Sequence, residues 1–468
     1  MPKKAQKVFT QISIADAGAR GVSIAKAPDG KVIMVDNAVP GDVCDIRIYK
    51  SKRGYHQGKA ILFHTLSARR TQPKCEHFGV CGGCKWQHMD YESQLYFKQK
   101  EVYNNLRRIG KVELPEETPA LASANPYFYR NKMEFSFSDS RWLTEAEIAT
   151  DEAFTQNNAL GFHIPGRWDK ILDLKNCYLQ PEPSNSIRNA VKDFAIDKNL
   201  AFFNARNQSG FLRTLMIRTA STGEVMVLVQ FFHEDKTNRE LLLNFILDKF
   251  PQVTSLQYVI NTKPNDTLYN LEIICYHGKP VIEEEMEGLR FPIHAKSFYQ
   301  TNSAQAYELY KIVREFAGLT GKELVYDLYT GIGTIAQFVA KNAKRVVGIE
   351  SVPEAIADAK RCAETNKIAN VSFYVGDMKT LLCADFVSQN GLPDVVITDP
   401  PRDGMHKDVV EQLLQMAPEK IVYVSCNSAS QARDLNLLKE NYRVAKVRPV
   451  DMFPQTFHIE NVVLLEKI

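Results

Sequence analysis

The spacing of hydrophobic residues divides the chain into three parts, and the first consists of short alternating runs. Up to about residue 66, β-type runs at residues 31–37, 42–50 and 58–64 are separated by Gly and Pro. Short strands punctuated by turn residues at this interval are typical of a small barrel. We therefore expect residues 1–66 to form a β-barrel.

A helix and a second group of strands follow. Residues 89–110 carry apolar residues at helical spacing and end on Gly110, a residue suited to closing a helix. From about residue 125, β-type runs return, with one helical segment near residues 238–249. Residues 67–290 are thus expected to form a β-rich central domain, and its first helix is expected to pack on the C-terminal domain.

From residue 297 onward, strand-like and helical segments alternate. The strand-like runs are residues 324–333, 344–350, 371–377, 393–401 and 420–426. Such alternation predicts an α/β fold with a doubly wound parallel sheet. Residues 291–468 are therefore expected to form a third domain.

Length and cysteine content narrow the class of protein. A chain of 468 residues exceeds the size at which a single core keeps growing. No signal-peptide pattern is visible, and no apolar run approaches the roughly 18–20 residues of a membrane-spanning helix. We expect a cytoplasmic protein without membrane contact, whose nine cysteines are thiols, metal ligands or catalytic residues instead of disulfides.

The charge is unevenly distributed. The net charge is only +3, yet residues 1–70 hold thirteen Lys and Arg against five Asp. Basic and aromatic residues interleave there in a mixture suited to phosphates and stacked bases: Tyr49, Lys50, Lys52, Arg53, Tyr55, His56 and Lys59. The first domain is therefore expected to contact a polyanion, with a merely solvated basic surface as the alternative.

A glycine turn follows the first strand of the C-terminal domain. Gly331 and Gly333 allow a tight turn and close approach of a ligand to the backbone where a helix begins. Asp327, near the end of the strand, is placed to order this turn from beneath. NAD is the less favoured ligand, because its fingerprint requires a glycine where Ala336 stands.

Acidic residues end the next three strands. These residues are Glu350, Asp377 and Asp399. The carboxyl ends of parallel strands meet at one edge of a sheet, where ligands bind, and a carboxylate after the second strand suits ribose hydroxyls. The pattern predicts an adenosine-type pocket of the kind that binds S-adenosylmethionine.

A second candidate site lies in the central domain. Its four cysteines, the cysteine quartet, are Cys75, Cys81, Cys84 and Cys177. The first three form C-x5-C-x2-C, which suits zinc or an iron–sulfur cluster, and spacing does not separate the two. His77 and His88 keep a Cys3His zinc site open.

Five motifs carry a resemblance to a known family. They are FYQTN (298–302), DLYTGIGT (327–334), DPPR (399–402), SCN (425–427) and HIE (458–460). Their order and approximate spacing resemble the RumA/TrmA family of RNA uracil-5-methyltransferases over nearly the whole chain. The N-terminal barrel resembles a TRAM domain, which occurs in the ribosomal-RNA branch. The chain departs from the family pattern at Tyr329-Thr330-Gly331 and at Thr334.

The resemblance implies a Rossmann-like methyltransferase domain that uses S-adenosyl-L-methionine, an OB-like TRAM barrel and a central domain with a 4Fe-4S cluster. The implied cofactor-binding residues are Gln300, Tyr329, Thr334, Glu350, Asp377 and Asp399. The implied cluster ligands are Cys75, Cys81, Cys84 and Cys177.

Uracil chemistry agrees with this resemblance. C5 of uracil attacks a sulfonium methyl poorly until a thiolate adds to C6. Cys426, at a strand end beside Asn427, is the expected nucleophile. The C5 hydrogen must then be removed, and Glu460 is the family's candidate base, with His458 as an orienting residue.

The expected reaction is methylation of C5 of a uridine in 23S rRNA. The target base must leave its stack, which favours a single-stranded loop, and the enzyme is expected to be a monomer. A transfer-RNA substrate is the alternative, against which the barrel argues. A non-catalytic RNA-binding or chaperone protein with a methyltransferase fold is a third reading, against which Cys426, Glu460 and Asp399 argue.

Overall fold

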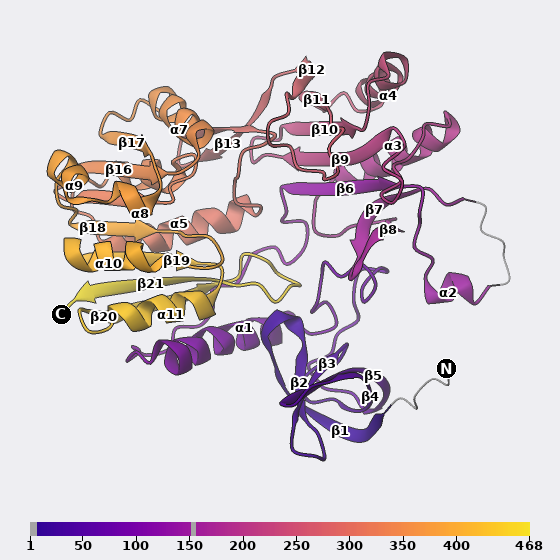
Figure 1. Cartoon of the computed structure of the whole chain (residues 1–468), viewed down its shortest axis with the longest axis horizontal. Helices are drawn as coiled ribbons and strands as arrows, with labels where there is room; N and C mark the ends of the chain where they lie inside the picture. The colour runs from indigo at the N-terminus through magenta and orange to yellow at the C-terminus, as the bar shows by residue number, and fades with distance from the viewer. Residues whose placement is uncertain (1–6, 151–155) are drawn as a thin grey trace.

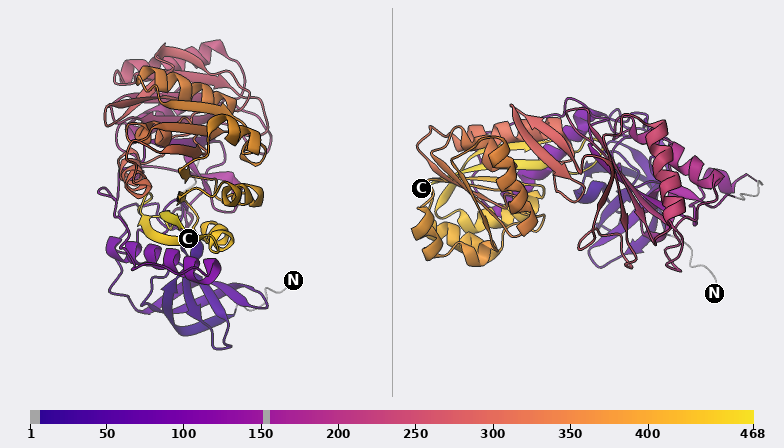
Figure 2. Two further views of the ribbon diagram at one scale, coloured as in Figure 1. Left: turned by 90° about the vertical axis from the view of Figure 1, so that its left-hand side faces the viewer. Right: turned by 90° about the horizontal axis from the view of Figure 1, so that it is seen from above.

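Three large sheets organise the computed structural model, which describes residues 7–150 and 156–468. A barrel lies at the bottom of Figure 1, and two open sheets lie side by side above it. Seen from above, these two sheets form separate lobes (Figure 2). Within the described part of the chain, no helix is long and apolar enough to cross a membrane.

The first sheet is the closed barrel that the sequence predicts. Its strands, in the order β1-β2-β3-β5-β4, are β1 (Val8–Ala17), β2 (Ser23–Lys26), β3 (Val32–Asp36), β4 (Val43–Ser51) and β5 (Tyr55–Thr65), with a short turn η1 (Ala19–Gly21). Alternate residues such as Ile33, Val35 and Ile46 point inward and are fully buried. The outer face exposes most of the residues expected to contact a polyanion, among them Lys50, Lys52 and Arg53. The expectation is wrong for His56, which is only 2% exposed and whose Nε2 lies 2.9 Å from Asp29 Oδ2.

The central domain is a seven-stranded sheet in the order β12-β11-β10-β9-β6-β7-β8. Its strands are β6 (Lys132–Ser138), β7 (Ala159–Ile164), β8 (Arg167–Asp173), β9 (Leu212–Thr219), β10 (Val225–Phe231), β11 (Ser255–Ile260) and β12 (Ile274–Gly278). Its helices are α2 (Glu145–Ile148), α3 (Ser184–Asp197) and α4 (Lys236–Lys249). The expectation of a single helical segment after about residue 125 is wrong, because α3 also packs its Ile187, Val191 and Ala195 into the core.

A hairpin, β13 (Val281–Met286) with β14 (Leu289–His294), leads into the C-terminal sheet. The sheet order is β17-β16-β15-β18-β19-β21-β20. The strands are β15 (Leu324–Leu328), β16 (Arg345–Glu350), β17 (Val371–Val375), β18 (Val395–Thr398), β19 (Lys420–Ser425), β20 (Tyr442–Val450) and β21 (Glu460–Lys467). Strands β15 to β19 are parallel, which confirms the predicted doubly wound sheet, and β21 is reversed.

Helices cover both faces of this sheet. They are α5 (Ser303–Ala317), α6 (Thr334–Ala340), α7 (Pro353–Thr365), α8 (Met378–Leu381), α9 (Ala384–Asn390), α10 (Lys407–Met416) and α11 (Ser428–Leu438). Apolar residues of α5, α6 and α7 join one core, and those of α10 and α11 join another. The parallel strands between them are consequently buried on both sides.

A helix from the first half of the chain completes the second of these cores. It is α1 (Tyr91–Asn105), which continues as the π-helical turn η2 (Leu106–Gly110). Its Val102, Tyr103 and Leu106 share a core with Ala432 and Leu435 of α11, and Figure 1 shows α1 running beside β20 and α11. The helix therefore belongs structurally to the C-terminal domain, although some 200 residues separate it from that domain.

Candidate active site

The glycine turn after β15 is built around a buried carboxylate. Asp327 Oδ2 accepts hydrogen bonds from the Thr330 hydroxyl and from the Ala336 amide at 3.0 Å. Burial raises the pKa of Asp327 to about 7, an effect that these hydrogen bonds oppose. The prediction that Asp327 orders the turn from beneath is confirmed.

The two glycines of the turn face different surroundings. Gly331 and Gly333 both have positive φ, 56° and 77°, which favours glycine. A Cβ on Gly333 would meet the ring of Phe373 at 2.6 Å, whereas a Cβ on Gly331 would meet nothing within 4 Å. The turn is thus tightly packed on its sheet side and open at Gly331, where a ligand can approach the backbone.

Strand-end residues surround this open side. Glu350 ends β16 and accepts a hydrogen bond from the Gly331 amide at 3.2 Å. Asp377 caps α8 and remains half exposed. Tyr329 also has a positive φ of 62°, and burial, with the Asp377 charge second, raises the pKa of its phenol to about 12. Thr334 is buried where α6 begins. These four predicted cofactor-binding residues therefore gather around one turn.

The reversed strand β21 brings together the two residues predicted to carry out chemistry. Ser425 at the end of β19 pairs with Asn461 of β21. Because the two strands are antiparallel, the next residue along β19, Cys426, lies across from Glu460. The reversal also places Glu460, the first residue of β21, at the edge where the parallel strands end and where Asp399 follows β18.

Burial and charge set the ionisation of this group. Burial, with the nearby charges of Glu460 and Asp399 second and third, raises the pKa of Cys426 to about 11, an effect that Arg402 opposes. The pKa of Glu460 is raised well above its usual range by burial and by Asp399. Burial, with Asp327 second, raises the pKa of Asp399 to about 7. Glu460 is buried, whereas Cys426 and Asp399 are half-buried. A thiol and two carboxyl groups this close together do not all carry negative charge readily.

The loop after β18 is hydrogen-bonded to the residues that follow Cys426. Asn427 caps α11 and donates from Nδ2 to the carbonyl of Arg402 at 3.0 Å. Ser430 donates its hydroxyl to the same carbonyl at 2.9 Å. Sequence reasoning noted the DPPR motif but gave Arg402 no task. The structure makes it the cation beside Cys426, Glu460 and His458.

The segment from Asp451 to Ile459, here called the base loop, leads directly into Glu460. Lys98 of α1 donates to Asp451 Oδ1 at 2.6 Å and to the Phe453 carbonyl at 3.1 Å, and both charged side chains are fully buried. Gln94, one turn earlier, exchanges hydrogen bonds with Gln455, which has a φ of 68°. Sequence reasoning missed this contact. The contact could have been suspected because a glutamine and a lysine lie four residues apart on the same helix face as the apolar Val102.

The FYQTN segment supports the base loop from the other side. Asn302 caps α5 and donates from Nδ2 to the Met452 carbonyl at 3.0 Å. Gln300 is buried, and its carbonyl accepts a hydrogen bond from Asn131 at 2.9 Å. Phe298 is 73% exposed. His458 stacks on Phe457 at 4.0 Å, and burial lowers the pKa of its imidazole to about 4, so the ring is neutral near pH 7.

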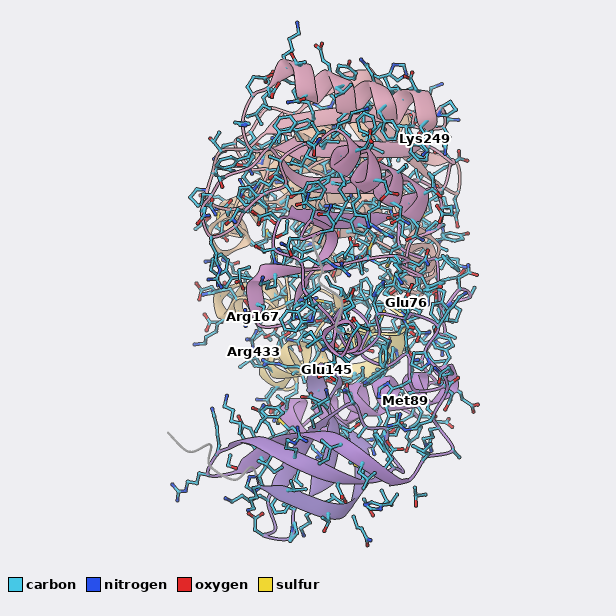
Figure 3. The ribbon with its side chains drawn as sticks, turned by 90° about the vertical axis from the view of Figure 1, so that its right-hand side faces the viewer. Glu76, Met89, Glu145, Arg167, Lys249 and Arg433 are labelled. Atoms are coloured by element: carbon cyan, nitrogen blue, oxygen red, sulfur yellow. The ribbon has the colours of Figure 1, made fainter. Side chains whose placement is uncertain are left out.

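The cysteine quartet lies between the central sheet and the barrel. Figure 3 labels Glu76 and Met89, which lie on either side of Cys81 and Cys84 in the sequence, in the region between the central sheet and the barrel. All four cysteines line one cavity of about 750 Å³ together with Arg130, Tyr178, Phe298 and His458. Gly82 approaches the turn between β7 and β8 so closely that a Cβ would meet Pro165 at 2.2 Å. The cavity thus extends from the quartet to the base loop.

The two histidines near the quartet are engaged elsewhere. Nε2 of His77 accepts a hydrogen bond from the Lys175 amide at 3.0 Å. Nε2 of His88 faces the carbonyl of Ala38 in the barrel at 3.3 Å. In residues 7–150 and 156–468, no three His, Cys, Asp or Glu side chains converge as ligands of a single metal ion.

A buried cation faces the quartet. Arg188 of α3 is fully buried, and its guanidinium donates to neutral oxygens of Asn185, Asn189 and Lys175. The charge of Arg188 acts on Cys177. Cys177 is the main source of negative charge for Arg188, with Asp173 and Glu182 after it, and a buried cation needs such charge nearby.

The C-terminal fold and its open glycine turn define an S-adenosylmethionine-dependent methyltransferase. Residues 281–468 match the family model described as tRNA (Uracil-5-)-methyltransferase. A protein of Bacteroides thetaiotaomicron described as an uncharacterized RNA methyltransferase is 58% identical, over 96% of this chain and 99% of its own. One of Porphyromonas gingivalis with the same description is 54% identical, over 97% and 99%. The chain belongs to the RNA (uracil-5-)-methyltransferase family.

A solved structure shares the whole architecture. The crystal structure of Pyrococcus abyssi tRNA (uracil-54, C5)-methyltransferase in complex with S-adenosyl-L-homocysteine is 27% identical and superimposes with a TM-score of 0.74. The match covers 97% of this chain and 99% of that chain, so it includes the barrel. The ligand of that neighbour agrees with S-adenosylmethionine as the methyl donor of this enzyme.

Proposed function

We propose that this enzyme methylates C5 of a uridine through a covalent adduct between Cys426 and C6 of the base. The observation that carries the proposal is the pairing of β19 with β21, which sets Cys426 across from Glu460 at the ligand-binding edge of the sheet. A nucleophile and a base side by side are what addition to C6 and proton removal from C5 require.

The site's own residues carry out the addition and the removal of the C5 proton. The Cys426 thiol gives its proton to solvent and adds to C6, and the electron pair of the C5=C6 bond moves toward C5 and O4. S-adenosylmethionine would supply the methyl group that C5 takes up and would leave as S-adenosylhomocysteine. Glu460 then removes the C5 proton, the double bond re-forms, and the thiolate leaves. A raised pKa makes Glu460 a stronger base than an exposed carboxylate, and Arg402 offsets the negative charge that the thiolate brings.

The remaining predicted residues surround the two ligands. Glu350 and Asp377 lie where ribose and adenine groups would meet the glycine turn, with Tyr329 and Thr334 at its two ends. Asp399 and Gln300 are proposed to hold the uracil edge and the methyl donor in register. With a pKa of about 7, Asp399 is able to donate or accept a hydrogen bond near neutral pH.

We propose a uridine in 23S rRNA as the target, because the cysteine quartet resembles that of the ribosomal-RNA branch of the family. Transfer RNA is the second candidate, favoured by the Pyrococcus abyssi neighbour, which is named for a transfer-RNA uridine and also spans the barrel. The barrel therefore does not separate the two substrates. Purified enzyme, labelled S-adenosylmethionine and unmodified 23S rRNA or transfer RNA distinguish them: label in 5-methyluridine of 23S rRNA supports the proposal, and label in transfer RNA alone overturns it.

We further propose that Cys75, Cys81, Cys84 and Cys177 hold a 4Fe-4S cluster. In such a cluster each thiolate binds a different iron, so the four thiols surround a cavity without converging on one point, in keeping with the cavity and the buried Arg188. The cluster would tie residues 75–84 to the segment before α3 and needs no redox step. Anaerobically purified protein should contain iron and acid-labile sulfide and absorb visible light; stoichiometric zinc without sulfide would overturn the assignment.

A further inference from the structure

Three aromatic rings surround a lysine at the rim of the quartet. The Nζ atom of Lys74 lies 5.2 Å from the ring centre of Tyr127, 4.8 Å from that of Phe128 and 5.1 Å from that of Tyr178. These four residues are called the Lys74 platform. Lys74 is exposed, Phe128 is 42% exposed, and the two tyrosines are partly exposed. A cation and ring faces are thus presented to solvent together.

Phe128 adopts a conformation that phenylalanine rarely takes. Its φ is 54°, in the left-handed region, where a bulky side chain is a genuine outlier. Its amide donates to the Tyr178 carbonyl at 2.8 Å, and the two rings meet at 6.0 Å and 65°. Burial does not explain this backbone, because the ring remains exposed. Strained residues of this kind cluster at ligand-binding sites.

The platform is continuous with the active site. The Arg130 amide donates to the Leu179 carbonyl, and the Asn131 amide donates to the Thr301 carbonyl of the FYQTN segment, both at 2.8 Å. Tyr178 and Arg130 line the same cavity as Phe298 and His458. The cavity therefore extends from the base loop past Arg130 to Tyr178, whose ring contacts the exposed ring of Phe128.

We propose that the Lys74 platform stacks an unpaired base of the RNA strand next to the target uridine, while Lys74 and Arg130 contact its phosphates. This inference rests on the proposed reaction on a uridine in RNA. Removing a target base from its stack leaves its neighbours without stacking partners. Aromatic faces beside cations are the surfaces that bind single strands without sequence preference.

The test uses a substitution that removes the ring and suits the backbone. Asparagine tolerates positive φ better than phenylalanine, so Phe128→Asn should leave the melting temperature unchanged or higher. Binding of a fluorescein-labelled oligouridylate should nevertheless weaken roughly 5- to 150-fold, the loss of one stacked base. Phe128→Trp should retain binding. Tyr269→Asn is the matched control, since Tyr269 is 77% exposed near the opposite edge of the central sheet.

A second probe separates stacking from charge. An abasic oligomer of equal length keeps the phosphates, so Phe128→Asn should bind it as the parent does, and Lys74→Gln should lower the salt dependence of binding by roughly one unit. Equal affinity of Phe128→Asn and parent for oligouridylate, or no binding by the parent, overturns the platform. Methyl transfer by the parent to RNA is measured separately, so its absence would refute the proposed reaction and not this surface.

Discussion

The enzyme places its cysteines in two surroundings that share burial and differ in charge. Burial raises the pKa of Cys426 to about 11, that of Cys81 to about 11 and that of Cys84 to about 12. Beside Cys426 stand two carboxyl groups and one arginine, whereas the quartet thiols face one another and the buried Arg188. A lone thiol among acids is held in its protonated form. Thiols gathered beside a cation suit a permanent ligand.

The largest effect is expected from substitutions around Cys426, which should abolish or slow methylation. Cys426→Ala removes the atom that adds to C6, so methylation should stop and no protein–RNA adduct should form. Glu460→Gln leaves the nucleophile intact, so an adduct should accumulate while turnover falls ~10² to 10⁴-fold, the usual contribution of a positioned base. Both are read on a denaturing gel with target RNA and S-adenosylmethionine. An adduct in Cys426→Ala, or parental turnover in Glu460→Gln, contradicts the two roles.

A substitution in the cysteine quartet should change the iron content and leave the reactivity of Cys426 unchanged. Cys177→Ser should lose iron, sulfide and visible absorbance, because one cluster ligand is gone, while the pH dependence of Cys426 alkylation stays as in the parent. Cys275→Ser is the control, since Cys275 is exposed on β12 and should change neither property. Full iron content in Cys177→Ser would exclude this residue as a ligand.

The base loop offers a smaller effect that leaves the quartet intact. Lys98→Met strands the buried charge of Asp451, which should lower the free energy of unfolding by about 3–5 kcal/mol, with iron content unchanged. Replacing both residues by Met and Leu should restore most of it. Lys100→Met is the matched control, because its pair with Asp16 is partly exposed and worth at most about 1 kcal/mol. Equal melting temperatures for the two single variants would argue against the buried pair as a stabilising contact.

The smallest effect concerns the pKa of Cys426. With a pKa of about 11, the thiolate fraction and hence alkylation by iodoacetamide should rise about tenfold per pH unit between roughly pH 7 and 10. Glu460→Gln removes a negative neighbour, lowers this pKa and should speed alkylation at pH 9. Arg402→Gln should slow it. Mass spectrometry of the Cys426 peptide measures each rate, and the same rate in all three proteins would mean that these charges do not reach the thiol.

Local patterns in the sequence sufficed for the strands of the barrel and of the parallel sheet, because each strand shows its own apolar pattern and turn residues. The role of Asp327 was also predictable, because its partners Thr330 and Ala336 lie within nine residues. Local patterns could not predict that Cys426 and Glu460 lie across from each other. This arrangement requires β21 to run antiparallel to β19, and the alternation of apolar residues does not reveal the direction of a strand. Helix α3 was not predicted because it buries the charged Arg188 together with Ile187, which hides the helical periodicity of its apolar residues.

The pairing of Lys98 with Asp451 has a consequence for how the molecule is assembled. The two residues are 353 positions apart, and the bridge between Leu121 and Val450 is nearly as distant. During synthesis α1 therefore emerges long before the strands that cover it. Its apolar face stays uncovered while roughly three hundred further residues are added. Contacts of such high order slow folding and expose surfaces that aggregate. A fragment limited to residues 281–468 would lack the helix that closes its core, so the catalytic unit is discontinuous in the gene and complete only when the last strand leaves the ribosome.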